Sequence, residues 1–355
     1  MSHSLDAVFT KRRIIITCGT GGVGKTTLSA AMAVRAALSG KRTVVITIDP
    51  AKRLATSLGL EKLGDQPTDL TEALREACRR VAPEHANFTG KLEAIVPDTK
   101  HTFETFVRSI ASSDANAERV LRNPIFQVFA KEFSGTNEYM ALERLYSLAT
   151  DEDYDCIVLD TPPSRNTLAF LDAPGLLARL FEEKLIRWLT IPANKIVAAG
   201  MKKAMGVLER LTGSGFMTNL VDFSSALFEM QAKFAGNLRK VMELLRSDQV
   251  GALMVTTANP EAAPEIQHFI ETLKSRGMNF EGVAVNRMLS PLGEAKAGAA
   301  SDEALTLIES LQARERAIID QICSSELPVC VKLPELARDV HSVEDLLYVA
   351  LALAA

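Results

Sequence analysis

A glycine-rich run near the amino terminus has the residue types of a phosphate-binding loop. Residues 19–26 read Gly-Thr-Gly-Gly-Val-Gly-Lys-Thr and fit the spacing GxxxxGK[ST]. Glycines let the backbone wind tightly, so that successive N–H groups converge on phosphate oxygens. Lys25 is a compact charge that can reach terminal phosphates, and the Thr26 hydroxyl is a ligand for Mg²⁺. The spacing therefore predicts a nucleotide site whose contacts come from Gly21, Gly22, Val23, Gly24, Lys25, Thr26 and Thr27.

Two aspartates follow apolar runs and extend this predicted chemistry. Asp160 follows the run at 156–159, where phosphate-loop NTPases carry the carboxylate that holds the Mg²⁺ shell. Asp49 ends the run at 44–48, where a carboxylate can orient the water that attacks the γ-phosphate. Each aspartate also has a simpler interpretation, as a residue that caps or forms the next turn.

Short apolar runs that alternate with helical patterns must position these residues. Such a pattern predicts an α/β fold with a doubly wound, mostly parallel sheet that helices cover on both faces. Ligands of these sheets bind beyond the carboxyl ends of the strands, where Asp49, Asp160 and Asn286 are expected. The predicted strands are 13–17, 43–48, 92–96, 156–159, 252–256, 282–285 and 329–333.

Two stretches interrupt the alternation and are predicted to form an inserted α-helical subdomain. They are residues 101–147 and 172–247, in which apolar residues recur at helical spacing without a convincing strand. The whole chain, 1–355, is accordingly expected to be one domain that carries these helical insertions.

Composition narrows the class of protein. The net charge is −4 and no basic footprint for nucleic acid is visible, so no nucleic-acid partner is expected. No signal peptide and no apolar stretch of membrane-spanning length is found, which predicts a cytoplasmic protein without a transmembrane segment. The cysteines are odd in number and lack CxxC spacing, so they are expected to be reduced thiols; they are Cys18, Cys78, Cys156, Cys323 and Cys330.

Four segments have a recognisable combined pattern. They are the loop at 18–27, Thr-Ile-Asp-Pro-Ala-Lys-Arg-Leu at 47–54, Asp-Thr-Pro-Pro-Ser-Arg-Asn-Thr-Leu-Ala-Phe-Leu at 160–171, and Val-Ala-Val-Asn at 283–286. Together they resemble the arsenite-pump ATPase (ArsA) family, which includes the targeting ATPase for tail-anchored membrane proteins. Weaker matches are Leu-Pro-Glu at 333–335 and the segment at 135–141, which is similar to bacterial members.

The resemblance implies a role for each matching residue and an architecture for the whole protein. Asp49 matches the switch I aspartate that polarises the attacking water, and Asp160 matches the Mg²⁺-shell aspartate. Asn286 matches the residue that reads adenine, beneath a loop around Pro334 that covers the base, although a strand-end amide can simply cap a turn. The family works as two bodies that close face to face around ATP and Mg²⁺. One phosphate loop in 355 residues therefore implies a homodimer.

Three departures from the family leave the manner of activation open. Thr20 occupies the position of a lysine that usually reaches the partner's nucleotide. Arg165 is the candidate catalytic replacement and Arg53 the second, while both also fit the description of ordinary surface arginines. The CxxC pair that holds zinc in some targeting members is absent, so no structural zinc is predicted. The helical insertions contain no cysteine, which argues against a soft metalloid site there.

The helical insertions are expected to carry the specific function. Five methionines fall between 201 and 242, with phenylalanines among them, and such residues suit a groove for varied apolar helices. An ordinary helical core explains the same pattern. Three hypotheses follow: an ATPase whose dimer closure binds and releases an apolar helix of a client protein or a membrane-embedded partner, the motor of an arsenite or antimonite efflux system, and a ParA-like nucleotide switch.

Overall fold

The protein is described by a computed structural model that covers most of the chain. The described residues are 5–47, 53–61, 63–127, 136–161, 171, 173–175, 215–289, 302–324, 327, 330–336 and 339–353. They divide into two compact units. Unit 1 comprises Met1–Pro97, Ser147–Leu168 and Leu244–Ala355, and unit 2 comprises Asp98–Tyr146 and Ala169–Glu243.

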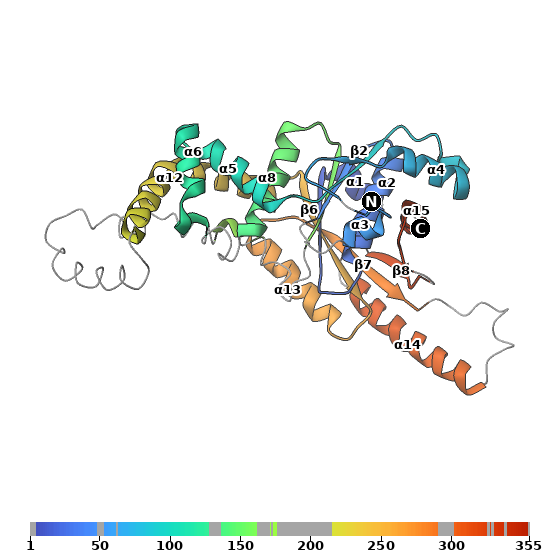
Figure 1. Ribbon diagram of the computed structural model, residues 1–355. Helices are drawn as coiled ribbons and strands as arrows, with labels where there is room; N and C mark the ends of the chain where they lie inside the picture. The colour runs from blue at the N-terminus through green and yellow to red at the C-terminus, as the bar shows by residue number, and fades with distance from the viewer. Residues whose placement is uncertain are drawn as a thin grey trace. The chain divides into compact units, whose positions relative to one another are not determined.

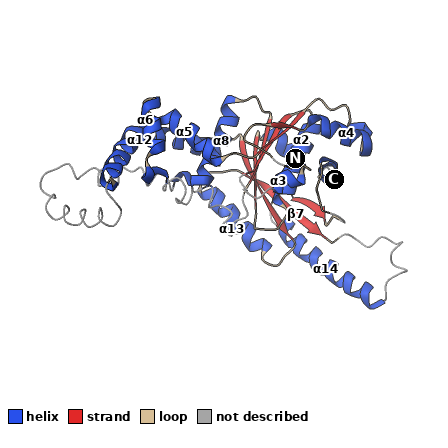
Figure 2. Ribbon diagram, in the orientation of Figure 1, coloured by secondary structure: helices blue, strands red, loops and turns tan. Residues whose placement is uncertain are grey.

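Unit 1 contains an eight-stranded sheet in the order β3-β4-β2-β5-β1-β6-β7-β8 (Figures 1 and 2). Neighbouring strands pair in parallel except β3 with β4, which are antiparallel. The α/β fold with a mostly parallel sheet, predicted from the apolar runs, is confirmed. The strands are β1 (Ile14–Cys18), β2 (Arg42–Thr47), β3 (Thr68–Asp69), β4 (Lys91–Ile95), β5 (Cys156–Asp160), β6 (Val250–Thr257), β7 (Phe280–Met288) and β8 (Cys330–Pro334).

The central strands are buried at successive positions because helices cover both faces of the sheet. Every residue of β1 and β5 is buried, which explains why their sequences are continuous apolar runs rather than alternating ones. The helices of unit 1 are α1 (Leu5–Lys11), α2 (Lys25–Leu38), α3 (Arg53–Ser57), α4 (Thr71–Val81), the 3₁₀ helix η1 (Pro83–His85), α13 (Ala262–Ser275), α14 (Asp302–Ser324) and α15 (Val343–Ala352).

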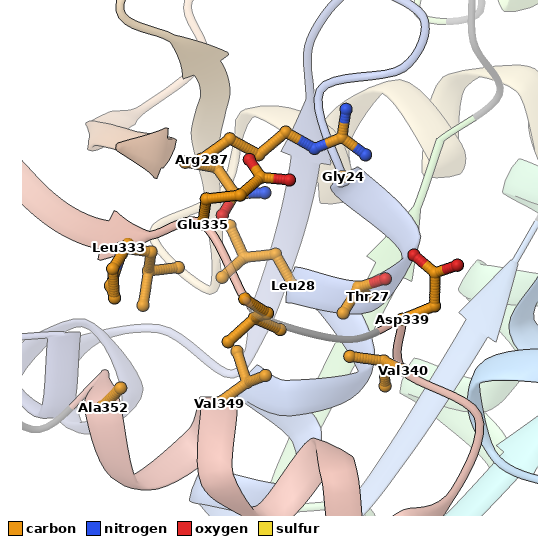
Figure 3. A pocket seen from close by; sticks show the side chains of 13 residues that line it. Gly24, Thr27, Leu28, Arg287, Leu333, Glu335, Asp339, Val340, Val349 and Ala352 are labelled. Carbon is orange, nitrogen blue, oxygen red and sulfur yellow. The ribbon is translucent and has the colours of Figure 1, made fainter. Parts of the chain in front are cut away.

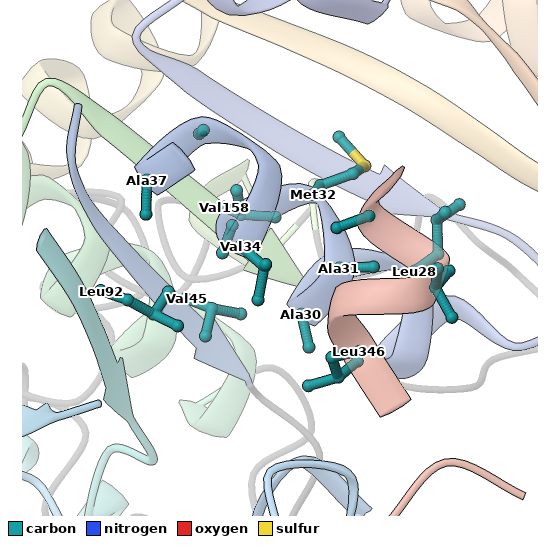
Figure 4. Packing of buried hydrophobic residues seen from close by; sticks show 14 of the residues in the cluster. Leu28, Ala30, Ala31, Met32, Val34, Ala37, Val45, Leu92, Val158 and Leu346 are labelled. Atoms are coloured by element: carbon teal, nitrogen blue, oxygen red, sulfur yellow. The ribbon is translucent and has the colours of Figure 1, made fainter. Parts of the chain in front are cut away.

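Helix α2 is the central helix of the main hydrophobic core, and it begins at the predicted loop. Its alanine-rich sequence favours a helix and allows close packing, and the chain leaves it through Gly40 at φ 88°. Figure 4 shows α2 with Val45 and Val158 of the sheet on one side and Leu346 of α15 on the other. Burial of a large side chain such as Leu28 or Met32 stabilises the fold by about 1.5–3 kcal/mol. This packing fixes the first turn of α2 against the sheet.

Unit 2 is helical in its described part. Asp98 and Ser113 cap the first two helices by accepting hydrogen bonds from backbone N–H groups. The rings of Phe106, Tyr139 and Phe234 pack together with centroids 5.4–5.8 Å apart. The helices are α5 (Thr99–Ile110), α6 (Asp114–Arg122), α8 (Thr136–Asp151) and α12 (Phe216–Arg246), and the unit boundaries fall within the last two.

The methionines and phenylalanines singled out in the insertions are only partly described. Phe223, Met230 and Phe234 are buried in the core of unit 2, whereas Phe228 is 59% exposed. For the three buried residues the structure favours an ordinary helical core over an open groove. Residues 176–214 of the predicted insertion, which include Met201 and Met205, lie outside the described residues.

Candidate nucleotide-binding site

The loop between β1 and α2 has a backbone that only glycine can follow at two positions. Gly19 has φ 154°, and a Cβ there would lie 2.2 Å from the carbonyl oxygen of Val255 on β6. Gly24 is the N-cap of α2 with φ 90°, and a Cβ there would lie 2.3 Å from Nδ2 of Asn286. The loop is therefore held closely between its own helix and the neighbouring strands.

Lys25 is the first residue of α2 and is only 5% exposed. Its Nζ donates a hydrogen bond of 2.8 Å to the backbone oxygen of Thr20, across the loop. Lys25, Thr26 and Thr27 line a cavity of about 500 Å³ together with Gly22 and Gly24. A buried ammonium group, loop N–H groups and a helix N-terminus that face one cavity form an arrangement suited to a polyphosphate.

Asp160 ends β5 and is fully buried behind the first turns of α2. Its Oδ2 accepts a 2.8 Å hydrogen bond from the hydroxyl of Thr47 at the end of β2, and its Oδ1 accepts a weaker one, at 3.5 Å, from Ser29. The Ser29 hydroxyl in turn lies 2.6 Å from that of Thr17. Asp160 is therefore connected to β2, α2 and β1 through hydroxyl groups.

The hydroxyl of Thr26 and the carboxyl group of Asp160 carry oxygen atoms of the kind that bind a magnesium ion. Mg²⁺ prefers carboxylate and hydroxyl oxygens and keeps several waters. The Thr26 hydroxyl lines the larger cavity and can bind the ion directly, whereas the buried Asp160 suits a role through water. Thr26 at the cavity and the buried Asp160 stay the predicted metal pair.

Asn286 and Pro334 lie together at a second cavity. Asn286, near the end of β7, donates a 2.9 Å hydrogen bond from Nδ2 to the backbone oxygen of Val23. Pro334 ends β8 and pairs in register with Met288. Both residues line a cavity of about 110 Å³ beside α2, with apolar walls from Leu28, Leu333 and Leu336 (Figure 3). The structure therefore brings the two residues predicted for the base to one cavity next to the loop, which charged as well as apolar side chains line.

The structure describes only some of the other residues that the sequence predicts for the site. Asp49 and Arg165 lie outside the described residues. Arg53, the second candidate for the missing lysine, is the first residue of α3 and lines the larger cavity. Thr20 is half-buried, and its carbonyl oxygen accepts the hydrogen bond from Lys25.

The structure also reveals site residues that the sequence did not indicate. The hydroxyls of Thr17, Ser29 and Thr47 form the hydrogen-bond network at Asp160. Arg287 and Asp339 line both cavities. Thr47 could have been found, because it is a hydroxyl residue directly before the end of a predicted strand. Arg287 could not, because it reaches the site through an irregular backbone that no local sequence pattern predicts.

The cysteines near the loop are buried and protonated. Burial raises the pKa of Cys18 to about 12, with Lys25 acting weakly in the opposite direction, and burial raises that of Cys156 to about 12. Both are therefore neutral thiols at neutral pH, poor ligands for a soft ion. Cys323 forms a disulfide bond, so the prediction of five reduced thiols is wrong there, because spacing does not show which thiols the fold brings together.

The fold and the loop define a phosphate-loop α/β protein, with the loop following the central strand of a parallel sheet. The family model described as "Anion-transporting ATPase" matches residues 12–354, nearly the whole chain. The chain belongs to this family of ArsA-type ATPases, and the resemblance found in the sequence is confirmed.

Individual relatives align with the chain at less than 30% identity, over different shares of its length. The "ATPase ASNA1 homolog 1" of Paramecium tetraurelia is 29% identical over 167 residues, 46% of this chain and 44% of that relative. The "ATPase asna-1" of Caenorhabditis elegans is 24% identical over 328 residues, 92% of this chain and 88% of that relative. An Aquifex aeolicus protein provisionally named arsenical pump-driving ATPase 2 is 24% identical, over 78% of this chain and 80% of its own length. The chain thus spans less than half of the Paramecium relative.

Proposed function

We propose that the protein is a Mg²⁺-dependent ATP hydrolase whose nucleotide site is the loop at 19–26. The observation that carries this proposal is Lys25, whose buried ammonium group faces the larger cavity from the first turn of α2. An arriving phosphate would replace the Thr20 carbonyl as the acceptor for Nζ. Because the surroundings are already ordered, this exchange would cost little reorganisation.

In this proposal the remaining residues bind the Mg²⁺ ion, orient the attacking water or contact the adenine base. Thr26 and Asp160 would hold the Mg²⁺ shell, and the ion would supply charge that offsets the phosphates. Asp49, two residues after β2 in the sequence, would orient the attacking water, and Arg165 would supply the positive charge that Thr20 lacks. Asn286 and Pro334 would contact the adenine from the smaller cavity, where the apolar side chains of Leu28 and Leu333 suit the face of a base.

We further propose that the protein works as a homodimer whose closure on ATP controls an apolar helical segment of a client or a membrane-embedded partner. Membership in a family with face-to-face members and the single phosphate loop support the dimer. The exposed ring of Phe228 on α12 supports an apolar contact in unit 2. Among the residues that the structure describes, no helix is long and apolar enough to cross a membrane. The buried neutral thiols of Cys18 and Cys156 disfavour a metalloid efflux motor.

The first experiment measures phosphate release from ATP, with Mg²⁺ present and with Mg²⁺ chelated. Lys25→Ala should lose turnover and ATP binding, because the loop loses its charge. Asp49→Asn should keep ATP binding and lose turnover. Lys274→Ala removes an exposed lysine on α13 and is the matched control, expected to be unchanged. Normal hydrolysis by Lys25→Ala would reject the proposed site.

The second experiment uses the Asp49→Asn variant, which should bind ATP without hydrolysing it and so keep the dimer closed. Its mass in solution should double relative to the nucleotide-free protein, and it should bind a labelled apolar helical peptide of membrane-spanning length. Stimulation of wild-type turnover by antimonite would favour the efflux motor instead. A nucleotide-dependent dimer that binds no peptide would favour the ParA-like switch.

A further inference from the structure

Arg287 has the most unusual backbone among the described residues. It is the one non-glycine residue there with a positive φ, at 59°. For an L-residue other than glycine this left-handed conformation is unfavourable, and it persists where the surrounding structure requires it. It follows Asn286 directly, at the edge of the proposed base cavity.

The pairing of β7 with β8 shows how this conformation arises. Val285 pairs with Lys332 and Met288 pairs with Pro334, so two residues of β7 lie opposite Leu333 alone. The extra residue forms a bulge, after which pairing resumes with a 2.7 Å hydrogen bond from the Glu335 N–H to the Met288 oxygen. Bulges of this kind redirect side chains near functional sites.

The bulge brings two consecutive side chains to the same side of the sheet edge. In a regular strand, Asn286 and Arg287 would point to opposite faces. Here both line the smaller cavity, and Arg287 also lines the larger one with Gly24 and Thr27 (Figure 3). The guanidinium therefore lies where the proposed phosphate and base cavities meet.

The side chain has no other evident task in this part of the protein. Within the described ranges, the Arg287 guanidinium makes no hydrogen bond or ion pair, although Glu335 and Asp339 line the same cavity. The side chain is also exposed, so it does not contribute to the core. A strained backbone that presents a charged group without a partner to the junction of two cavities indicates a ligand contact.

We infer that Arg287 binds the α-phosphate of the nucleotide, an assignment that rests on the proposed nucleotide site. A nucleotide with its base beside Asn286 and its terminal phosphates at Lys25 would place the α-phosphate between the two cavities. The planar guanidinium of arginine suits phosphate oxygens. The contact would be common to ATP and ADP and independent of the γ-phosphate.

The test compares the binding of ADP and of inorganic pyrophosphate by calorimetry. Arg287→Met should weaken ADP binding about tenfold, the usual effect of a lost charge-assisted hydrogen bond, while pyrophosphate affinity stays within about twofold. Arg287→Lys should recover part of the loss. Lys332→Met removes an exposed charge from the paired strand and should bind ADP normally.

A glycine variant separates binding from backbone strain. Arg287→Gly should lose ADP affinity like Arg287→Met but show an equal or higher melting temperature, because glycine adopts a positive φ without strain. Unchanged ADP affinity in Arg287→Met would overturn the assignment, as would an equal loss for pyrophosphate or adenosine. If the wild-type protein itself bound no ADP, the nucleotide site would fail instead, independently of Arg287.

Discussion

The buried carboxylate of Asp160 depends on a hydroxyl from another strand. Thr47→Val keeps the shape of the side chain but removes the 2.8 Å hydrogen bond to Oδ2. We expect the free energy of unfolding to fall by about 1–3 kcal/mol, because a fully buried charged group loses a donor. The Mg²⁺ concentration for half-maximal turnover should also rise, since Asp160 would be held less firmly.

Denaturant unfolding and a Mg²⁺ titration of turnover measure these two effects. Thr47→Ser is the matched variant, because it restores the hydroxyl and loses only a methyl group. If Thr47→Val and Thr47→Ser behaved alike in both measurements, the hydroxyl would have no part in placing Asp160.

At the residue scale, the sequence could predict groups that belong to a local pattern. Lys25 and Thr26 are fixed by the spacing of the loop, and Asp160 by the strand that it ends. Arg287 could not be predicted, because its position depends on an extra residue relative to a strand more than 40 positions away. Thr47 could be seen as a strand-end hydroxyl, but its partner on the neighbouring strand could not be predicted.

The loop as an element depends on close backbone packing at Gly19. In Gly19→Ala the new Cβ would lie 2.2 Å from the Val255 oxygen, and φ 154° is unfavourable for alanine, so either the loop or β6 must shift. We expect a loss of about 2 kcal/mol or more in unfolding free energy and at least tenfold weaker ADP binding. Urea unfolding and calorimetry provide the two values.

Gly64→Ala is the control for this element. Its added Cβ would have no neighbour within 4 Å, and Gly64 has no positive φ, so stability and ADP binding should stay close to wild type. Wild-type stability in Gly19→Ala would contradict this prediction, because the loop would then accommodate the added Cβ without cost.

Elements were predictable where their patterns were long. The seven apolar runs correspond to β1, β2, β4, β5, β6, β7 and β8. The strand β3 has only two residues and pairs antiparallel at the sheet edge, so it has no periodicity to detect. Helix α1 was also not predicted, because its seven residues form only two turns and show too little periodicity. Its apolar residues Leu5, Val8 and Phe9 are buried against the core, which the local sequence does not reveal.

At the scale of the whole molecule, the sheet explains why distant segments form one site. The chain passes from β1 to β2 on one side and reaches β6 on the other, so β1 lies at the topological switch point. Carboxyl ends of neighbouring parallel strands meet at that edge, which brings residues 19–26, 160, 286 and 334 toward one region. The parallel alternation was predictable, but the register that decides which side chains meet is a property of the assembled sheet.

The stability of the folded protein should fall at alkaline pH because thiols are buried in the sheet. Burial raises the pKa of Cys18 and Cys156 from 9.0 to about 12. Between these values the folded state keeps protons that the unfolded state releases, so ionisation favours unfolding as pH rises above about 9. Each thiol can contribute up to about 1.4 kcal/mol per pH unit in that window.

Urea unfolding of the whole protein at pH 7.5, 9 and 10 tests this expectation. The wild-type midpoint should stay level to about pH 9 and then decline. The Cys18→Ala/Cys156→Ala double variant should be less stable at every pH, because the core loses volume, but its decline between pH 9 and 10 should be shallower. Parallel curves for the two proteins would mean that other buried acids cause the decline. Burial also raises the pKa of Tyr139 and Tyr154, but their ordinary value of 10.0 places their contribution at higher pH.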